Sequence, residues 1–281
     1  MDRFVPTSFG WQPDLPDFRD FTYDTDEVRK ALQDLKTRRG RDGLPGSVDL
    51  REFFLEPFDQ GTLASSPAHA CAALLEYFER RSHGHVLPPS RLFLHRNARH
   101  MAMTSNHTVN LRATLKVIAR CGLPPERYWP YDVNNADLDP NAFLYSFVDR
   151  FRELLYVRLG NHNTPCNIIL DNVRSSLAAG FPTVFGLAVP SSISRAPEIL
   201  YRPAFDSIIG GQALVAVGYD DKWLRSTRGA LLVLNSWGID WGDQGYGWLP
   251  YAFIEQRLAV DFWTMLRSDW IESGEFFHPM T

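Results

Sequence analysis

The sequence predicts an α+β protein in which helices dominate the first half of the chain and strands the second. Two observations lead to this prediction. Between residues 66 and 121, apolar side chains recur every three or four positions, which is the spacing of a helix. From residue 181 onwards, short apolar runs alternate with polar residues and are interrupted by glycines, a pattern that favours a small antiparallel barrel. A chain of 281 residues is long enough for one large core or a two-lobed one.

The longest helix is predicted to begin near Ser65 or Ser66 and to run to about Arg81. Either serine can cap the helix, and Pro67 then lies at or near its first position, where the missing N–H costs nothing. The first turns are apolar on nearly all sides, so we expect this helix to be buried. Further helices are predicted at 25–38, from 88 onwards, at 108–121, 139–150 and 164–180.

Strands are predicted at 153–159, 181–189, 212–219, 230–235, 247–249 and 260–266. The first 23 residues are different, because they contain three prolines and several aromatic residues without a helical or strand period. We expect this segment to run extended over a surface. The side chains predicted to pin it are Phe4, Trp11, Phe18, Phe21 and Tyr23.

Composition argues against several classes of function. The net charge of −4 gives no reason to expect binding to nucleic acid or to an anionic membrane. No apolar run approaches the ~18–20 residues needed to span a bilayer, and the first residues lack the apolar stretch of a signal peptide. Cys71, Cys121 and Cys166 are odd in number and widely spaced, so we expect buried thiols rather than disulfides or a metal site. These features predict a cytoplasmic protein without metal or cofactor.

Three motifs bring polar residues into a recognisable order. In the first, Gln60-Gly61 precedes Ser66 at the start of the predicted long helix, and the glutamine lies six residues before the serine. The second is Gly210-Gly211-Gln212-Ala213, which opens a predicted strand. The third is Asn235-Ser236-Trp237-Gly238-x-x-Trp241-Gly242-x-x-Gly245-Tyr246-Gly247. From about residue 44 to 266 the chain resembles the papain family of cysteine peptidases, in its bacterial form without the usual disulfides.

The resemblance implies a papain-like fold of two lobes, with a cleft between a helical lobe and a β-barrel lobe. It places the papain-like domain at 44–266, with the first lobe at about 44–138 and the second at about 139–266. Residues 1–43 stand where the family has a pro-segment, and we predict a packed extension that is retained. The sequence does not specify whether this extension fills the cleft. Residues 267–281 would form a C-terminal tail. The implied binding cleft includes Ser65, Gly210, Gly211 and Trp237, and the glycine-free stretch 103–108 is expected to narrow or refill it.

The departures from the family concern the catalytic residues. Ser66 stands where the family has its nucleophilic cysteine, and Gln212 stands where it has the general-base histidine. Asn235, which would orient that histidine, and Gln60, the oxyanion-hole donor, are kept. A serine hydroxyl needs a base within hydrogen-bond reach, and an amide does not exchange protons near neutral pH. The resemblance therefore implies an inactive site in which Asn235 bonds Gln212 and Ser66 completes the network. His69 is expected to pack inside the protein rather than to replace the base.

Three functions remain open from the sequence. The first is a catalytically inactive pseudopeptidase that binds a protein or peptide partner as a scaffold or regulatory module. The second is a serine-type hydrolase or acyltransferase that uses Ser66 with an unconventional base. The third is a structural subunit whose exposed aromatic residues dock on a larger assembly, for which Trp270 and Phe276-Phe277 in the tail are the candidates. The first is preferred, because both catalytic positions are replaced. The sequence does not specify the oligomeric state.

Overall fold

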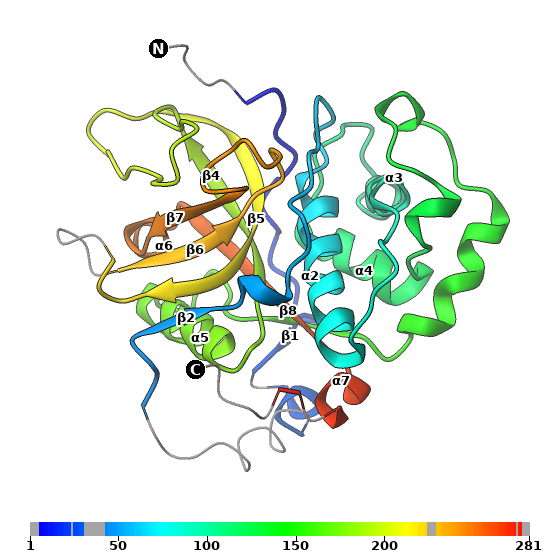
Figure 1. Cartoon of the computed structure of the whole chain (residues 1–281), viewed down its shortest axis with the longest axis horizontal. Coiled ribbons are helices and arrows are strands. Elements are labelled where there is room, and N and C mark those ends of the chain that lie inside the picture. Colours follow the sequence, from blue (N-terminus) through cyan, green and yellow to red (C-terminus); the bar gives the residue numbers. More distant parts are fainter. Residues whose placement is uncertain (1–5, 24, 31–42, 224–228, 274, 277–281) are drawn as a thin grey trace.

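The computed structural model describes residues 6–23, 25–30, 43–223, 229–273 and 275–276. Two lobes lie side by side, one built on a sheet and the other on helices (Figure 1). Helix α2 (Ser66–His83) stands between them and packs against strands β4 and β5 on one side and helices α3 and α4 on the other. The predicted α+β architecture of two lobes is therefore confirmed. Among the described residues, no helix is long and apolar enough to cross a membrane.

Helix α2 is buried along almost its whole length, as its sequence predicts. Pro67 lies in its first turn, and Gly84 ends it in a left-handed conformation with φ of 73°. Small residues in the first turns let the sheet approach closely, and Cys71 is completely buried. The three cysteines are free thiols, of which Cys121 and Cys166 are half-buried.

The helical lobe contains α3 (Arg91–Met101) and α4 (Leu111–Cys121), together with the 3-10 helices η2 (Glu126–Tyr128), η3 (Val133–Asn135) and η4 (Ala142–Phe151). Ser90 caps α3 by accepting the Phe93 amide, and Asn110 caps α4 by accepting the Ala113 amide. Another 3-10 helix, η1 (Arg51–Phe53), precedes α2.

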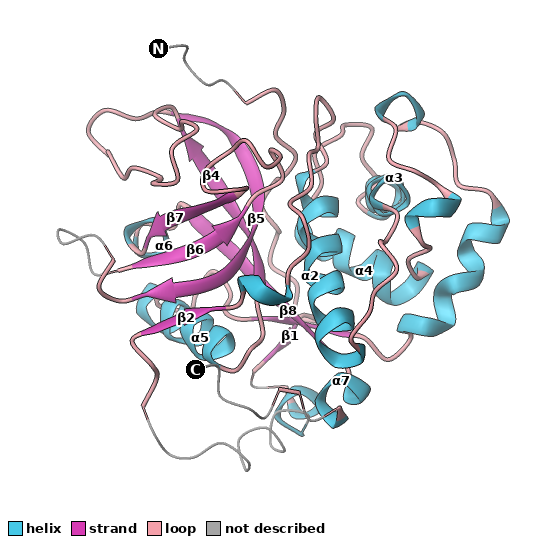
Figure 2. Ribbon diagram, viewed as in Figure 1, coloured by secondary structure: helices cyan, strands magenta, loops and turns pink. Residues whose placement is uncertain are grey.

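The sheet lobe is one eight-stranded sheet in the order β1-β3-β8-β4-β5-β6-β7, with β2 paired to β5 (Figure 2). Its strands are β1 (Phe21–Thr22), β2 (Ser47–Asp49), β3 (Leu155–Arg158), β4 (Thr183–Pro190), β5 (Ile208–Asp220), β6 (Ala230–Leu234), β7 (Tyr246–Pro250) and β8 (Ala259–Leu266). The pair β1–β3 is parallel, and the other strand pairs of the described residues are antiparallel. Each predicted strand is present, and β5 begins four residues earlier than predicted. Helix α5 (Cys166–Ala178) packs against β4 and β5, and α6 (Ala252–Glu255) packs against α5 and β8.

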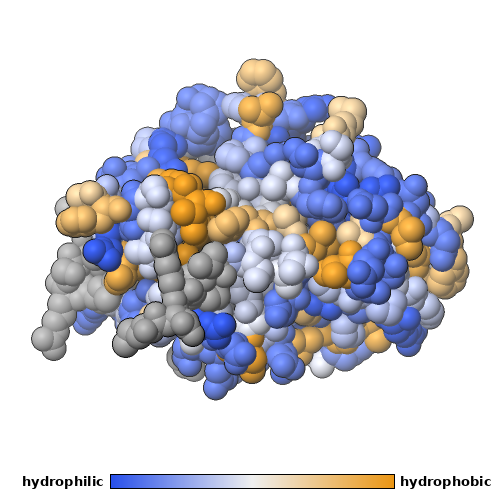
Figure 3. Space-filling view, turned by 90° about the horizontal axis from the view of Figure 1, so that it is seen from above, coloured by the Kyte–Doolittle hydropathy of each residue, from blue (hydrophilic) through white to orange (hydrophobic). Residues whose placement is uncertain are grey.

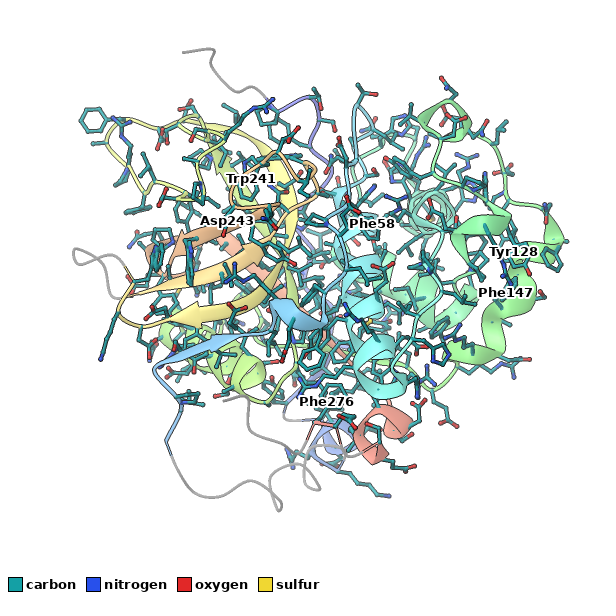
Figure 4. The ribbon with its side chains drawn as sticks, viewed as in Figure 1. Phe58, Tyr128, Phe147, Trp241, Asp243 and Phe276 are labelled. Carbon is teal, nitrogen blue, oxygen red and sulfur yellow. The ribbon has the colours of Figure 1, made fainter. Side chains whose placement is uncertain are left out.

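The predicted boundary between the lobes is wrong by about one element. Helix η4, which the sequence analysis assigns to the second lobe, packs against α4 in the helical lobe. Tyr145 on η4 donates a hydrogen bond to Asn97 Oδ1 at 2.9 Å, and Phe147 lies against Tyr128 with ring centroids 5.6 Å apart. Figure 4 shows Tyr128 and Phe147 together on the outer side of this lobe. The chain crosses to the sheet lobe only after η4, at β3.

The N-terminal extension is part of the folded body. Strand β1 adds to the sheet beside β3, and residues 26–30 are helical, as the prediction of a helix at 25–38 requires; the rest of that range lies outside the described residues. Trp11 is buried, as predicted, whereas Phe18 is fully exposed and pins nothing. Phe21 and Tyr23 pack against the core, and Phe4 lies outside the described residues.

The C-terminal tail folds back against α2 through helix α7 (Ser268–Glu272). Trp270 stacks on Phe78 with ring centroids 4.7 Å apart, and Phe276 packs on Phe181 at 4.8 Å. Figure 4 shows Phe276 beside the lower end of α2. The prediction that these aromatic residues are exposed is wrong, because Trp270 and Phe276 are both fully buried. Phe277 lies outside the described residues.

Candidate functional site

Ser66 begins α2 and lies at the junction of the two lobes. Its side chain is fully buried, and its Oγ accepts a hydrogen bond from the Ala213 amide of β5 at 3.0 Å. This bond ties the start of α2 to the sheet. Among the described residues, no histidine is hydrogen-bonded to this hydroxyl.

A network of buried amides lies next to Ser66 and joins the two lobes. Gln212 Nε2 donates to Gln60 Oε1 and to Asn235 Oδ1, both at 2.9 Å. Ser236 Oγ donates to Gln60 Oε1 at 2.6 Å. The predicted bond between Asn235 and Gln212 is confirmed. The prediction that Ser66 completes this network is wrong, since Gln60 and Ser236 complete it and Ser66 bonds to the backbone of β5 instead.

Gln60 is the residue that the family resemblance assigns to the oxyanion hole, and its amide hydrogens are already engaged. Its Nε2 donates to Ser8 Oγ at 2.9 Å and to the Leu63 carbonyl at 3.2 Å. A substrate oxyanion would have to displace Ser8 before it could receive a hydrogen bond from Gln60. Gln212 Oε1, by contrast, is buried without a hydrogen-bond partner among the described residues.

His69 lies one turn after Ser66 on α2, and no hydrogen bond joins their side chains among the described residues. Its Nδ1 is within hydrogen-bond distance of the Ser65 carbonyl at 3.0 Å and the Ser65 hydroxyl at 3.3 Å, and its ring packs edge-on against Phe58 and Tyr131. Burial, reinforced by the positive charge of Arg91, lowers the pKa of His69 to about 3. The imidazole is therefore neutral and packed, as the sequence analysis expects.

Ser65 was predicted to line the cleft, and the structure corrects this. The side chain is fully buried on the helical side, where its hydroxyl hydrogen-bonds with Tyr131 Oη at 2.8 Å.

Trp237 is half-buried, and its ring packs edge-on against Trp241. Phe58, at the boundary between the lobes in Figure 4, precedes Gln60 on the segment that leads into α2.

An extended segment, residues 6–12, fills the space between the lobes next to Ser66; we call this segment the strap. It descends between β5 and α2 in Figure 1. On the sheet side, the amides of Gly10 and Trp11 both donate to the Gly211 carbonyl, at 3.0 and 2.9 Å. On the helical side, the Val109 amide donates to the Gly10 carbonyl at 2.9 Å, and the Gln12 amide donates to the Val109 carbonyl at 3.1 Å. The strap is thus hydrogen-bonded through its backbone to both lobes.

Three glycines of the sheet lobe make room for the aromatic side chains of the strap. A Cβ atom on Gly210 would lie 2.4 Å from the Phe9 ring, and one on Gly186 would lie 1.9 Å from the Trp11 ring. On Gly211, a Cβ would lie 2.4 Å from the Trp11 carbonyl oxygen. Gly210 and Gly211, predicted to line the cleft, are therefore covered by the chain's own N-terminal segment.

The strap is held at its far end by a buried cluster of charges, which we call the latch: Asp14, Asp20, Arg112, Arg158 and Asp261. Arg112 Nε donates to Asp20 at 2.6 Å, and Arg158 bonds Asp20 at 3.1 Å and also pairs with Asp261. Asp14 accepts from Trp263 Nε1 at 3.2 Å, and its amide donates to Asp261 at 2.7 Å. The latch joins the extension to α4, β3 and β8.

The sequence leaves open whether residues 1–43 fill the cleft, and in the structure residues 6–12 do so. The spacing Phe9-Gly10-Trp11 indicates a cleft-filling segment only once Gly186, Gly210 and Gly211 are known to face these residues. Stretch 103–108 does not refill the cleft, since the strap occupies it and Met103 is almost fully exposed. The residue that bonds the strap is Val109, one position beyond that stretch. No group of three or more possible metal ligands occurs among the described residues.

Comparisons with known proteins agree with this architecture. No family model matches the chain. It is 28% identical over 278 residues to an uncharacterized peptidase C1-like protein of Acanthamoeba polyphaga mimivirus, covering 92% of this chain and 86% of the relative. Its structure matches that of xylellain, a cysteine protease from Xylella fastidiosa, with a TM-score of 0.74 and 29% identity over 95% of this chain and 99% of xylellain. In both sequence and fold, the chain is similar to papain-like cysteine peptidases.

More distant members share the fold alone. Procathepsin B from Trypanosoma congolense matches with a TM-score of 0.67 and 17% identity, over 92% of this chain and 86% of the procathepsin chain. Procathepsin L2 from the midgut of Tenebrio molitor larvae also matches with a TM-score of 0.67, at 18% identity. The papain-like chain described here therefore combines the family fold with serine and glutamine at positions 66 and 212.

Proposed function

We propose that this papain-like chain is a pseudopeptidase, without peptidase activity, that acts as a protein-binding or regulatory module. The observation that carries the proposal is the hydrogen bonding at the nucleophile position. Ser66 Oγ accepts from the Ala213 amide, and the side chain that should supply the base is the amide of Gln212, bonded to Gln60 and Asn235. Without a base, the serine hydroxyl is not deprotonated at neutral pH.

The surroundings of Ser66 support the same proposal. A scissile carbonyl must come within about 3–3.5 Å of the nucleophile, and the strap backbone occupies that space. A Cβ atom on Gly10 would lie 2.6 Å from the Ser66 nitrogen, so the strap runs directly over the start of α2. Only about 10 Å³ of space remains in the cavity beside His69, Ala213 and Asn235, enough for roughly one water molecule.

A hydrolysis and labelling assay tests the proposal. The native chain and its Ser66→Ala variant are incubated with a broad library of fluorogenic peptides and, separately, with a fluorophosphonate that labels activated serines. An active papain-family peptidase serves as the control for the peptide assay. We expect the two chains to be indistinguishable in both assays. Hydrolysis or labelling that disappears in Ser66→Ala would favour a serine-type hydrolase and overturn the proposal.

A further inference from the structure

The strap shows which kind of segment the space between the lobes accepts. We propose that this space is a recognition site for an extended protein segment with the pattern aromatic–glycine–tryptophan. The strap fills the site within the chain, and a partner protein carrying the same pattern fills it when the strap leaves. The inference rests on the proposed function, because it names the partner of an inactive cleft.

Backbone hydrogen bonds on both sides make the site suitable for any extended segment. The Gly211 carbonyl accepts two amides of the strap, and Val109 both donates to and accepts from it. Such bonds supply affinity without reading side chains, as in other cases where a peptide adds to the edge of a sheet. Specificity must therefore come from the side-chain positions on either side of Gly10.

Two aromatic side chains are accommodated by glycines that face them. Phe9 lies over Gly210 and Trp11 over Gly186, where any larger residue in the wall would overlap the ring. Trp11 is only 7% exposed, so it is a buried anchor of the kind that dominates the affinity of protein interfaces. Phe9 is half-buried and contributes a smaller apolar contact.

At the position between the two aromatic residues, the site accepts only glycine, because a larger residue would clash with it. A Cβ at position 10 would lie 2.6 Å from the Ser66 nitrogen and 2.8 Å from the Ala64 carbonyl carbon. Both are backbone atoms at the start of α2, which is fixed by the Ser66–Ala213 bond and by burial. They cannot move aside as a flexible side chain would. Any other residue at this position would have to lift the segment out of the site.

The strap can leave without dismantling the extension behind it. The contacts of the site come from residues 7–12, whereas Asp14 and Asp20 are held separately by the latch and Phe21–Thr22 by the sheet. A tethered segment of this kind competes at an effective concentration on the order of millimolar. A partner segment must therefore match the same pattern closely or meet a chain whose strap is weakened.

Trans binding to the full-length chain tests the proposal. The probe is a fluorescein-labelled peptide with the sequence of residues 6–12, and binding is followed by fluorescence anisotropy to the native chain and to Gly10→Ala. We expect the peptide to bind Gly10→Ala at least about tenfold more tightly than the native chain, because the clash ejects the competing strap. Gly46→Ala, where a Cβ meets nothing within 4 Å, is the matched control and should bind like the native chain.

A second peptide tests whether the site requires glycine between the two aromatic residues. With alanine in place of its glycine, the peptide should bind Gly10→Ala at least about tenfold more weakly than the parent peptide. Equal binding of the two peptides, or no binding of the parent peptide to a cooperatively folded Gly10→Ala chain, would overturn the proposal. If Gly10→Ala does not fold, Phe9→Ala replaces it, since this change weakens the strap without adding an overlap. The parent peptide must then again bind more tightly than to the native chain.

The same samples separate this inference from the proposed function. After incubation, mass spectrometry shows whether the parent peptide is intact. Intact, bound peptide supports both proposals. Cleaved peptide would overturn the inactive site while leaving the recognition pattern supported. Absence of binding, with no cleavage, would overturn the recognition pattern while leaving the inactive site supported.

Discussion

At the scale of single residues, the centre of this fold is held together by buried amide side chains. An amide cannot act as acid or base near neutral pH, but it can donate and accept hydrogen bonds at the same time. The Nε2 group of Gln212 donates both to Gln60, on the segment before α2, and to Asn235, at the end of β6, and so joins the two. The site thus connects the two lobes in the way that an ordinary buried polar network does.

This structural role predicts a loss of stability in Gln212→Leu. The leucine removes the Nε2 donor, so the hydrogen bonds to Gln60 Oε1 and Asn235 Oδ1 disappear in a buried region. Because Ser236 still bonds both acceptors, we expect the free energy of unfolding to fall by about 1–3 kcal/mol in urea titrations. Gln256→Leu, at an exposed glutamine, should change it by less than about 0.5 kcal/mol. Equal effects of the two substitutions would contradict the structural role.

The sequence predicts this site only in part. Gln60, Ser66, Gln212 and Asn235 do meet, because the motifs that carry them fix the turn before α2 and the starts and ends of β5 and β6. The sequence does not predict which atoms bond, and the Ser66 hydroxyl bonds the Ala213 amide of β5 rather than the amide network. That choice depends on the exact distance between α2 and β5, which Gly10 and the small residues of α2 set together.

At the scale of elements, the strap and the latch behave as two linked parts. The latch places three carboxylates, Asp14, Asp20 and Asp261, against two guanidinium groups, Arg112 and Arg158. One negative charge is therefore in excess in a buried place. Burial, followed by repulsion from Asp261, raises the pKa of Asp14 from 3.8 to about 7. A proton on Asp14 neutralises this excess negative charge.

The raised pKa predicts the direction of the pH dependence. An unfolded chain releases the Asp14 proton near pH 4, whereas the folded chain keeps it until about pH 7. The stabilisation from proton binding is fully present below about pH 4 and is lost as the pH rises to about 7. In Asp14→Asn this contribution is absent, so the native chain should lose stability relative to the variant by at most about 1.4 kcal/mol per pH unit across this window.

Urea unfolding of the native chain and Asp14→Asn, at half-unit steps from pH 4 to pH 8, measures this difference. Asp26→Asn removes a carboxyl whose side chain is 93% exposed, and its difference from the native chain should not change with pH in the same way. A constant difference between native and Asp14→Asn from pH 4 to pH 7 would show that Asp14 is ionised throughout.

The sequence predicts the bounds of most helices and strands, but it predicts less well which other elements they pack against. The strands from β3 to β8 are found because alternation and glycines mark their limits locally. Helix η4 has a helical sequence and was placed in the wrong lobe, because its aromatic residues pack on Tyr128 and Asn97, contacts that no local pattern reveals. The extended form of the N-terminal segment is predicted because its sequence has no helical or strand period. Its position between the lobes is not predicted, because that position depends on contacts with both lobes.

At the scale of the whole molecule, α2 is the central element, in contact with both lobes and with the C-terminal tail. The strap crosses its start, the sheet and the helices flank it, and α7 closes its far end. On the face seen from above in Figure 3, hydrophobic residues lie in small groups among hydrophilic ones and form no single large patch. The large aromatic residues near both termini are instead used inside, as Trp11 and Trp270 show.

The buried tail predicts that Trp270 stabilises the fold. Its ring stacks on Phe78, and its Nε1 donates to Glu79 at 3.1 Å. Glu79 also bonds Arg267 at 3.0 Å and pairs with Arg150, so the tail, α2 and η4 meet at one carboxylate. Trp270→Ala would remove a fully buried indole and leave a cavity at this junction, and we expect the free energy of unfolding to fall by about 3–5 kcal/mol.

Chemical denaturation followed by circular dichroism measures this loss, and Phe18→Ala provides the comparison. Phe18 is fully exposed, so its removal should change the free energy of unfolding by less than about 0.5 kcal/mol. If Trp270 served instead to dock the chain on an assembly, Trp270→Ala would match Phe18→Ala in stability and would differ only in what it binds. Loss of stability in Trp270→Ala alone would identify the tail as the closing element of the core around α2.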